Sequence, residues 1–132
     1  LRYIKDFYGV EVEYLWESSP ENGALRNPNN KKWFAVLLGS LPKSKLGIKS
    51  DEKSDALNLK CDPLFTFTVV DNVRVFPGFH MNKEHWISVL LDGSMPFEEL
   101  KGLVDLSYEL VDVKVKKKYK NYIWYKRKIV KK

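Results

Sequence analysis

The chain has 132 residues, of which 44% are hydrophobic and 14% aromatic, and it carries a formal net charge of +6. This length is typical of one domain, and the apolar content can form a core without disulfides or metals. No apolar run approaches the roughly 18 residues of a membrane span, and no signal peptide is recognised. We therefore expect a cytoplasmic protein without a membrane span. The one cysteine, Cys61, cannot form an internal disulfide, which fits a reducing compartment.

The positive charge is concentrated at the C-terminal end of the chain. Residues 114–132 contain ten lysines or arginines and no acidic side chain. The preceding residues contain thirteen basic and all seventeen acidic side chains, so the body of the protein is mildly acidic. We therefore divide the chain into a domain over residues 1–112 and a basic, aromatic C-terminal tail over residues 113–132.

The first third of the sequence predicts one helix and a series of short strands. Apolar residues at helical spacing predict a helix over residues 1–8, which Gly9 can close. Residues 12–16, 24–26 and 33–38 are predicted as strands, separated by turns rich in Asn, Gly and Pro. These runs predict an antiparallel meander.

The middle of the sequence predicts a loop, a strand and a short helix. Residues 39–56 are polar and predict an excursion loop, with a short extra strand at residues 46–48. Residues 57–60 are strand-like. An Asp-Pro pair at residues 62–63 favours the start of a helix over residues 63–69, because Asp caps free amide groups and proline suits the first turn.

The last part of the domain predicts two strands and the clearest helix of the chain. Residues 73–76 and 86–91 are predicted as extended, with a Pro-Gly break after the first. Ser94 and Pro96 open a helix whose apolar residues recur at three- and four-residue spacing. That apolar face comprises Phe97, Leu100, Leu103, Val104, Tyr108 and Val111.

Four motifs between residues 59 and 111 resemble, in order and spacing, successive signatures of the MmcQ/YjbR family. They are Leu-Lys-Cys-Asp-Pro at 59–63, Pro-Gly-Phe-His-Met-Asn-Lys-Glu-His-Trp at 77–86, Leu-Asp-Gly-Ser at 91–94 and Ser-Tyr-Glu-Leu-Val at 107–111. Upstream, Tyr-Leu-Trp at 14–16 and Lys-Lys-Trp-Phe-Ala at 31–35 are also similar. The resemblance covers most of residues 1–112, and four ordered motifs are more specific than any one of them.

The resemblance implies an α+β fold of two layers, in which one antiparallel meander sheet is backed by helices in the order α-β-β-β-α-β-β-α. The family is described as uncharacterised. A DNA-binding role has been suggested for it from the fold, sometimes called a double-wing arrangement, and one branch is associated with mitomycin resistance. The tail departs from the usual family end, so the resemblance implies nothing about it.

The motif at residues 77–86 contains the candidate ligand pocket. His80, Asn82, Lys83 and Trp86 place several donors and an aromatic ring in one loop, which could hold an anion or a small ligand. The alternative is structural, with Asn82 capping a turn and Lys83 facing water. We favour the structural interpretation.

Catalytic and metal sites receive weaker support from the sequence. His80 and His85 are five residues apart, which suits neither a helical metal pair nor a known zinc spacing. Cys61 and His80 could form a nucleophile and base, although a buried hydrophobic role for Cys61 is simpler. We therefore expect no cofactor, no metal and no catalytic residue.

The tail is the other candidate site. Its lysines and arginine alternate with aromatic rings, so cations could neutralise phosphates while the rings stack on unpaired bases. An anionic membrane or an acidic protein could also bind it, and a solvated extension or a hairpin turning at Lys120-Asn121 remains an alternative. The candidate residues are Lys116, Lys117, Lys118, Tyr119, Lys120, Tyr122, Trp124, Lys126, Arg127 and Lys128.

The sequence thus favours a non-enzymatic, monomeric binding module that contacts DNA or another nucleic acid through its tail. The alternative is a small-ligand or protein-binding domain with a pocket near His80–Trp86 and no nucleic-acid role.

Overall fold

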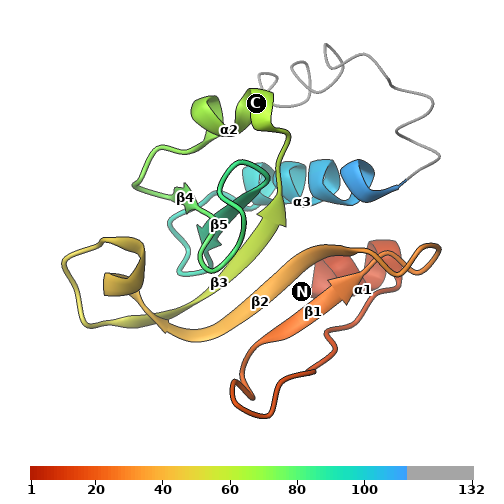
Figure 1. The fold of residues 1–132 in the computed structure, drawn as a ribbon, viewed down its shortest axis with the longest axis horizontal. Coiled ribbons are helices and arrows are strands. Elements are labelled where there is room, and N and C mark those ends of the chain that lie inside the picture. The colour runs from red at the N-terminus through yellow and green to blue at the C-terminus, as the bar shows by residue number, and fades with distance from the viewer. Residues whose placement is uncertain (113–132) are drawn as a thin grey trace.

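A computed structural model describes residues 1–112, and the whole of the predicted tail lies outside the described residues (Figure 1). The elements follow the predicted order α-β-β-β-α-β-β-α, so the α+β prediction is confirmed. They are α1 (Arg2–Tyr8), β1 (Gly23–Arg26), β2 (Trp33–Pro42), the 3-10 helix η1 (Lys43–Leu46), β3 (Lys53–Lys60), α2 (Pro63–Val69), β4 (Val75–Pro77), β5 (Trp86–Leu90) and α3 (Phe97–Val111).

The five strands form one antiparallel sheet in the order β1-β2-β3-β5-β4. β3 is the central strand, and Leu59 is paired with Ala35 of β2 on one side and with Ile87 of β5 on the other. The chain leaves β3 through α2, forms β4 at the far edge and returns as β5 between them. Among the described helices, none has the length and hydrophobicity that a membrane crossing requires.

The helices cover one face of the sheet. Alternate strand residues such as Leu57, Leu59 and Val89 enter a core that also contains Ile4 of α1 and Leu103 of α3. This period of two follows from the pleat of a strand, which points successive side chains to opposite faces. Figure 1 shows α1 and α3 on the same side of the sheet.

Loops, rather than helices, cover the opposite face. The intervening strand residues, including Val36, Phe76 and Trp86, form a second buried cluster. Partly buried side chains pack against it from the start of β2 (Trp33), from η1 (Leu46) and from the connecting segments: Trp16, Ile48, Phe79 and Met81. The sheet is therefore buried on both faces, which explains why its central strands have so few charged residues.

Two predictions for the first half of the chain were wrong. Residues 12–16 form no strand and pair with the sheet through a single isolated bridge, between Glu13 and Ala24. Residues 39–56 are not a loop, because β2 extends to Pro42 and β3 begins at Lys53, with η1 replacing the predicted strand at 46–48. The polar residues misled the prediction because this end of the hairpin is largely exposed, and a bulge near Ser40 breaks its register.

Helix α3 matches its prediction in extent, but Phe97 is 57% exposed rather than buried. Ser107, in contrast, is completely buried against the sheet. Its hydroxyl donates to the carbonyl oxygen of Phe34 in β2 and accepts from the backbone N–H of Lys60 at 2.8 Å. One serine thus joins α3 to two strands and satisfies backbone groups at the ends of their ladders.

We expect Ser107→Ala to lower the free energy of unfolding by about 1–3 kcal/mol, because it leaves a buried N–H and a buried carbonyl without this partner. Denaturant unfolding measures the change. Ser44→Ala, on the exposed surface of η1, is the matched control and should stay within about 0.5 kcal/mol of the parent. Equal stability of the Ser107 and Ser44 variants would contradict the assigned role of Ser107.

Candidate functional site

The loop over residues 77–86 lies directly on strand β5. The N–H of Gly78 donates to the carbonyl oxygen of Trp86 at 3.0 Å. A Cβ added to Gly78 would lie 2.7 Å from the Cβ of Trp86, closer than real side chains approach one another. The glycine is therefore required by close packing against Trp86, which is itself buried.

A closed hydrogen-bond ring holds the same loop on the sheet. Asn58 of β3 and Ser88 of β5 face each other in register and are completely buried. Ser88 accepts from the N–H of Phe79 at 2.8 Å and donates to the side-chain oxygen of Asn58. The amide of Asn58 in turn donates to the carbonyl oxygen of Phe79 at 3.0 Å. Both backbone groups of Phe79 and both side chains are thereby satisfied in a buried site.

The candidate pocket residues brace this loop. The ammonium group of Lys83 donates to the carbonyl oxygen of Gly78 at 2.6 Å. The side chain of Asn82 accepts from the N–H of Glu84 at 2.9 Å, which closes a tight turn. These polar groups are directed at the backbone of the loop itself.

The two aromatic residues of the predicted pocket lie in different environments. Trp86 is buried in the second cluster, whereas His80 is exposed and has a φ of 59°, an unusual backbone conformation for a residue other than glycine. The ring of His80 packs edge-on against Phe79, with 4.0 Å between ring centroids. None of the three pockets described below contains His80, Asn82, Lys83 or Trp86 in its lining.

Cys61 and His80 belong to different faces of the sheet. Cys61 is buried in the helix-side core, and it lines a cavity of about 10 Å³, room for about one water molecule. The loop that carries His80 covers the opposite face. Among residues 1–112, no group of three or more His, Cys, Asp or Glu side chains is arranged to hold a metal ion.

A carboxylate shared by two phenols attaches α1 to α3. The hydroxyls of Tyr3 and Tyr8 donate to the same oxygen of Asp105, at 2.7 Å and 2.6 Å. Burial, and then the negative charge of Asp105, raise the pKa of both phenols well above the ordinary value, so both remain donors. The ring of Tyr8 also stacks on Tyr108 at 3.9 Å between centroids. These contacts are structural.

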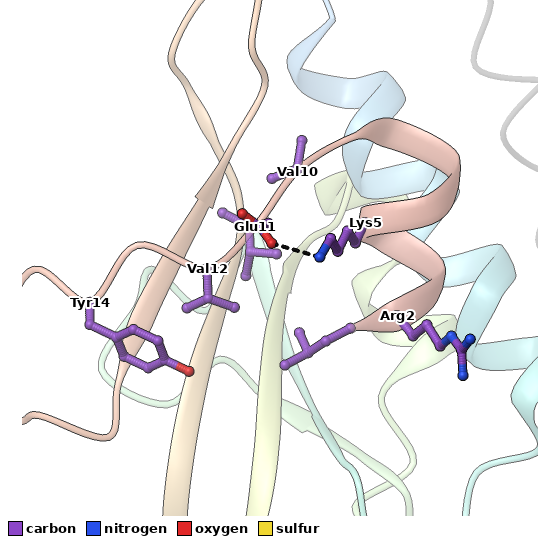
Figure 2. A pocket seen from close by; sticks show the side chains of 8 residues that line it. Arg2, Lys5, Val10, Glu11, Val12 and Tyr14 are labelled. Atoms are coloured by element: carbon purple, nitrogen blue, oxygen red, sulfur yellow. Dashed lines mark ion pairs between the residues drawn. The ribbon is translucent and has the colours of Figure 1, made fainter.

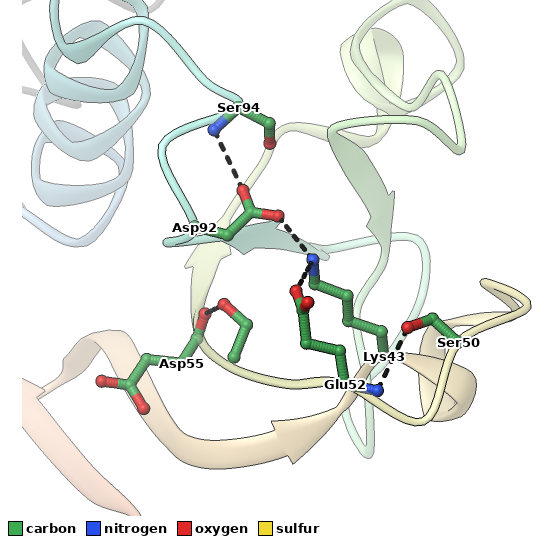
Figure 3. Close-up of polar contacts among 7 residues, drawn as sticks. Lys43, Ser50, Glu52, Asp55, Asp92 and Ser94 are labelled. Atoms are coloured by element: carbon green, nitrogen blue, oxygen red, sulfur yellow. Dashed lines mark hydrogen bonds and ion pairs between the residues drawn. The ribbon is translucent and has the colours of Figure 1, made fainter.

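A second polar cluster ties the β2–β3 hairpin to the turn before α3 (Figure 3). The ammonium group of Lys43 lies 2.6 Å from Glu52 and 3.0 Å from Asp92. Hydrogen bonds from Ser94, and then the Lys43 ammonium, lower the pKa of Asp92 to about 2. The cluster fixes the hairpin relative to the body.

Two open grooves lie on either side of residues 10–13. The first has a volume of about 450 Å³ and separates this segment from α1; the ion pair between Lys5 and Glu11, 3.0 Å long, crosses it (Figure 2). The second, of about 510 Å³, lies toward the β1–β2 turn. The first groove is lined by Leu1, Arg2, Lys5, Val10, Glu11, Val12, Tyr14 and Leu25. The second is lined by Gly9, Val10, Glu11, Glu13, Arg26, Pro28 and Lys31.

Sequence reasoning missed Asn58, Ser88 and the two grooves. A signal existed for the first two, since each is a polar residue flanked on both sides by apolar residues of a strand. Such a position faces a buried cluster and must find a partner. The grooves gave no signal, because residues 12–16 were expected to form a strand.

Comparisons with known proteins agree with this fold. A family model described as YjbR matches residues 5–110. The chain is 38% identical to the uncharacterized protein YyaQ of Bacillus subtilis over 109 residues, which are 83% of this chain and 92% of that protein. It is 40% identical to the uncharacterized protein YjbR of Escherichia coli over 63 residues, 47% of this chain and 53% of that protein. A crystal structure of a Pseudomonas syringae protein superposes with a TM-score of 0.78 at 34% identity, covering 83% of this chain and 92% of the other.

The contact of Gly78 with Trp86 predicts opposite effects for two glycine substitutions. Gly78→Ala should lower the free energy of unfolding by about 1–3 kcal/mol, because the added methyl group forces the loop off β5. Gly102→Ala, in α3 and with no atom within 4 Å of the added Cβ, should raise it by about 0.5–1 kcal/mol. Thermal or denaturant unfolding of both variants measures this, and a neutral Gly78→Ala would contradict the close packing.

The lowered pKa of Asp92 predicts a pH-dependent stability difference. Asp92→Asn should destabilise the protein at neutral pH by up to about 1 kcal/mol, the scale of a solvent-screened ion pair. Since the folded pKa of Asp92 is below the unfolded one, this stabilisation is complete above about pH 4 and is lost as the pH falls toward 2. Unfolding curves at several pH values test it, with Asp51→Asn as the exposed control. A difference that persists unchanged at pH 2 would contradict it.

Proposed function

The chain belongs to the YjbR family, and we propose that it is a non-enzymatic binding module that contacts nucleic acid through its basic tail. The matched relatives are themselves named as uncharacterized, so the proposal rests on the residues of this chain. We further propose that it acts in the cytoplasm, since its one cysteine cannot form an internal disulfide, and that it is a monomer.

The separation of charge between body and tail is the observation that carries the proposal. The ten basic residues of 114–132 have no acidic neighbour in the tail, and four aromatic residues lie among them: Tyr119, Tyr122, Trp124 and Tyr125. Lysine and arginine bind phosphates with little dependence on sequence, and each contact releases a counterion. Aromatic rings add stacking on unpaired bases, which favours single strands over duplexes.

The body supports this role by presenting the tail at a fixed point. Val111, at the end of α3, is buried, and its carbonyl oxygen accepts from the side chain of Asn30 at 2.5 Å. Because the described domain has more acidic than basic side chains, we expect it to repel a polyanion, which the tail attracts.

The pocket hypothesis for residues 80–86 has less support. Lys83 and Asn82, which would supply donors and acceptors to a ligand, bond to the backbone of their own loop. A ligand would have to compete with these bonds, or use the exposed His80 and the donors that remain on Lys83 and Asn82.

We expect replacement of Lys116, Lys117 and Lys118 by Gln in the full chain to weaken binding of a single-stranded oligonucleotide. Loss of three phosphate contacts should reduce the slope of log affinity against log salt by about 2. The matched control replaces Lys45, Lys49 and Lys53, three exposed lysines of the β2–β3 hairpin, by Gln. Fluorescence anisotropy at several salt concentrations measures both.

The control should keep the salt slope of the parent, although it has lost the same charge. Equal weakening of both variants would contradict a role specific to the tail, and no binding by the parent chain would contradict nucleic-acid binding altogether.

A further inference from the structure

An acidic, exposed segment runs along one edge of the molecule. Residues 6–25 contain five acidic side chains and no basic one, and all five are exposed: Asp6, Glu11, Glu13, Glu17 and Glu21. In the rest of the described domain, acidic and basic side chains occur among one another. This segment therefore has the opposite charge to residues 114–132, which contain ten basic side chains and no acidic one.

The acidic segment covers the open edge of the sheet incompletely. β1 is an edge strand, and residues 10–16 run beside it in an irregular conformation (Figure 1). Two hydrogen bonds of 2.9 Å between Glu13 and Ala24 are the bridge that joins them. An edge covered in this way retains space for another chain, whereas a continuous strand would close it.

The two grooves are that space. Both are lined by Val10 and Glu11, so they follow the acidic segment on its two sides; Figure 2 shows the first of them. Apolar surface accompanies the charge, since Tyr14 is 60% and Leu15 43% exposed.

Basic side chains balance the carboxylates within the grooves, Arg2 and Lys5 in the first and Arg26 and Lys31 in the second. The excess of carboxylates comes from the adjoining part of the segment, at Glu17 and Glu21. That excess, with the exposed apolar side chains, matches a partner that alternates cations with aromatic rings.

The tail follows the end of α3, which lies near the second groove. The side chain of Asn30 holds the end of α3, and Pro28 and Lys31 of the same turn line the second groove. The twenty residues after Asp112 can span on the order of 60 Å when extended, which is ample to follow the segment. A tether of this kind raises the effective concentration to the millimolar range, so weak contacts suffice.

We infer that the tail, residues 114–132, docks on the acidic edge of its own domain, defined as residues 10–21 together with β1. The inference concerns the protein without nucleic acid and does not require the proposed function. Existing ion pairs do not prevent docking, because Lys5–Glu11 and Arg26–Glu13 are solvent-accessible pairs that water and salt screen. Glu17 and Glu21 form no ion pair within residues 1–112 and accept tail lysines directly.

Docking has a consequence for nucleic-acid binding, and this part rests on the proposed function. The same lysines cannot neutralise phosphates and carboxylates at once, so the acidic edge competes with nucleic acid for the tail. Weakening the edge should therefore strengthen binding of the oligonucleotide.

Zero-length carbodiimide cross-linking of the full chain, followed by peptide mapping, tests the docking. Tail lysines should become linked to Glu11, Glu13, Glu17 or Glu21 in material that migrates as a monomer, and high salt should abolish the links. The edge variant is Glu11→Gln, Glu17→Gln and Glu21→Gln. It keeps Glu13 and therefore the ion pair between Arg26 and Glu13.

The control variant is Asp51→Asn, Glu84→Gln and Glu98→Gln, with three exposed carboxylates removed elsewhere and the same net charge. The edge variant should lose about fivefold or more of the cross-linking to the tail, and the control should lose none. Links to Asp51, Glu84 or Glu98 as frequent as those to the edge would overturn the inference. So would an absence of tail links, or links found only between two copies of the chain.

Oligonucleotide affinity of the same two variants separates this inference from the proposed function. The edge variant should bind about fivefold or more tightly than the control, whose net charge is identical. Edge links without any oligonucleotide binding would leave the docking intact and contradict the proposed function. Oligonucleotide binding without edge links would support the proposed function and contradict the docking.

Discussion

Asn58 and Ser88 are polar side chains buried at the centre of the sheet, and a buried polar group without a partner is costly. Their mutual hydrogen bond leaves the amide N–H group of Asn58 and the hydroxyl oxygen of Ser88 to be paired, and the backbone of Phe79 accepts from the first and donates to the second. The loop over residues 77–86 must therefore lie on the sheet in one position. That position brings Gly78 against Trp86 and closes the face that no helix covers.

Each layer of the fold is attached by hydrogen bonds from a few partly or fully buried polar side chains. On the helix side, Ser107 repeats the device by bonding to backbone groups of β2 and β3, and Tyr3 and Tyr8 attach α1 to α3 through Asp105. On the loop side, the bonds of Lys83 and Asn82 stay within the loop. The most recognisable motif of the sequence thus covers the loop side of the sheet, while the helices cover the other side.

The resemblance to the family implied the order of the elements, and the Asp-Pro pair at residues 62–63 predicted the start of α2. Periodicity predicted the extent of α3, because this helix buries one regular face. It failed where tertiary contacts decide the conformation. Residues 12–16 alternate like a strand, but only Glu13 pairs with β1, and the polar end of the β2–β3 hairpin is extended despite its composition. The roles of Asn58 and Asp105 depend on partners at least 21 residues away, which no local pattern reveals.

The central claim is that the basic tail binds nucleic acid while the loop over residues 77–86 has a structural role. Backbone chemical shifts of the full chain test it most directly. On titration with a single-stranded oligonucleotide, we predict that signals of residues 114–132 shift with binding. Those of residues 10–21 should shift with them as the tail leaves the acidic edge, while residues 77–86 stay unchanged. Shifts confined to residues 77–86, with an unperturbed tail, would contradict the claim.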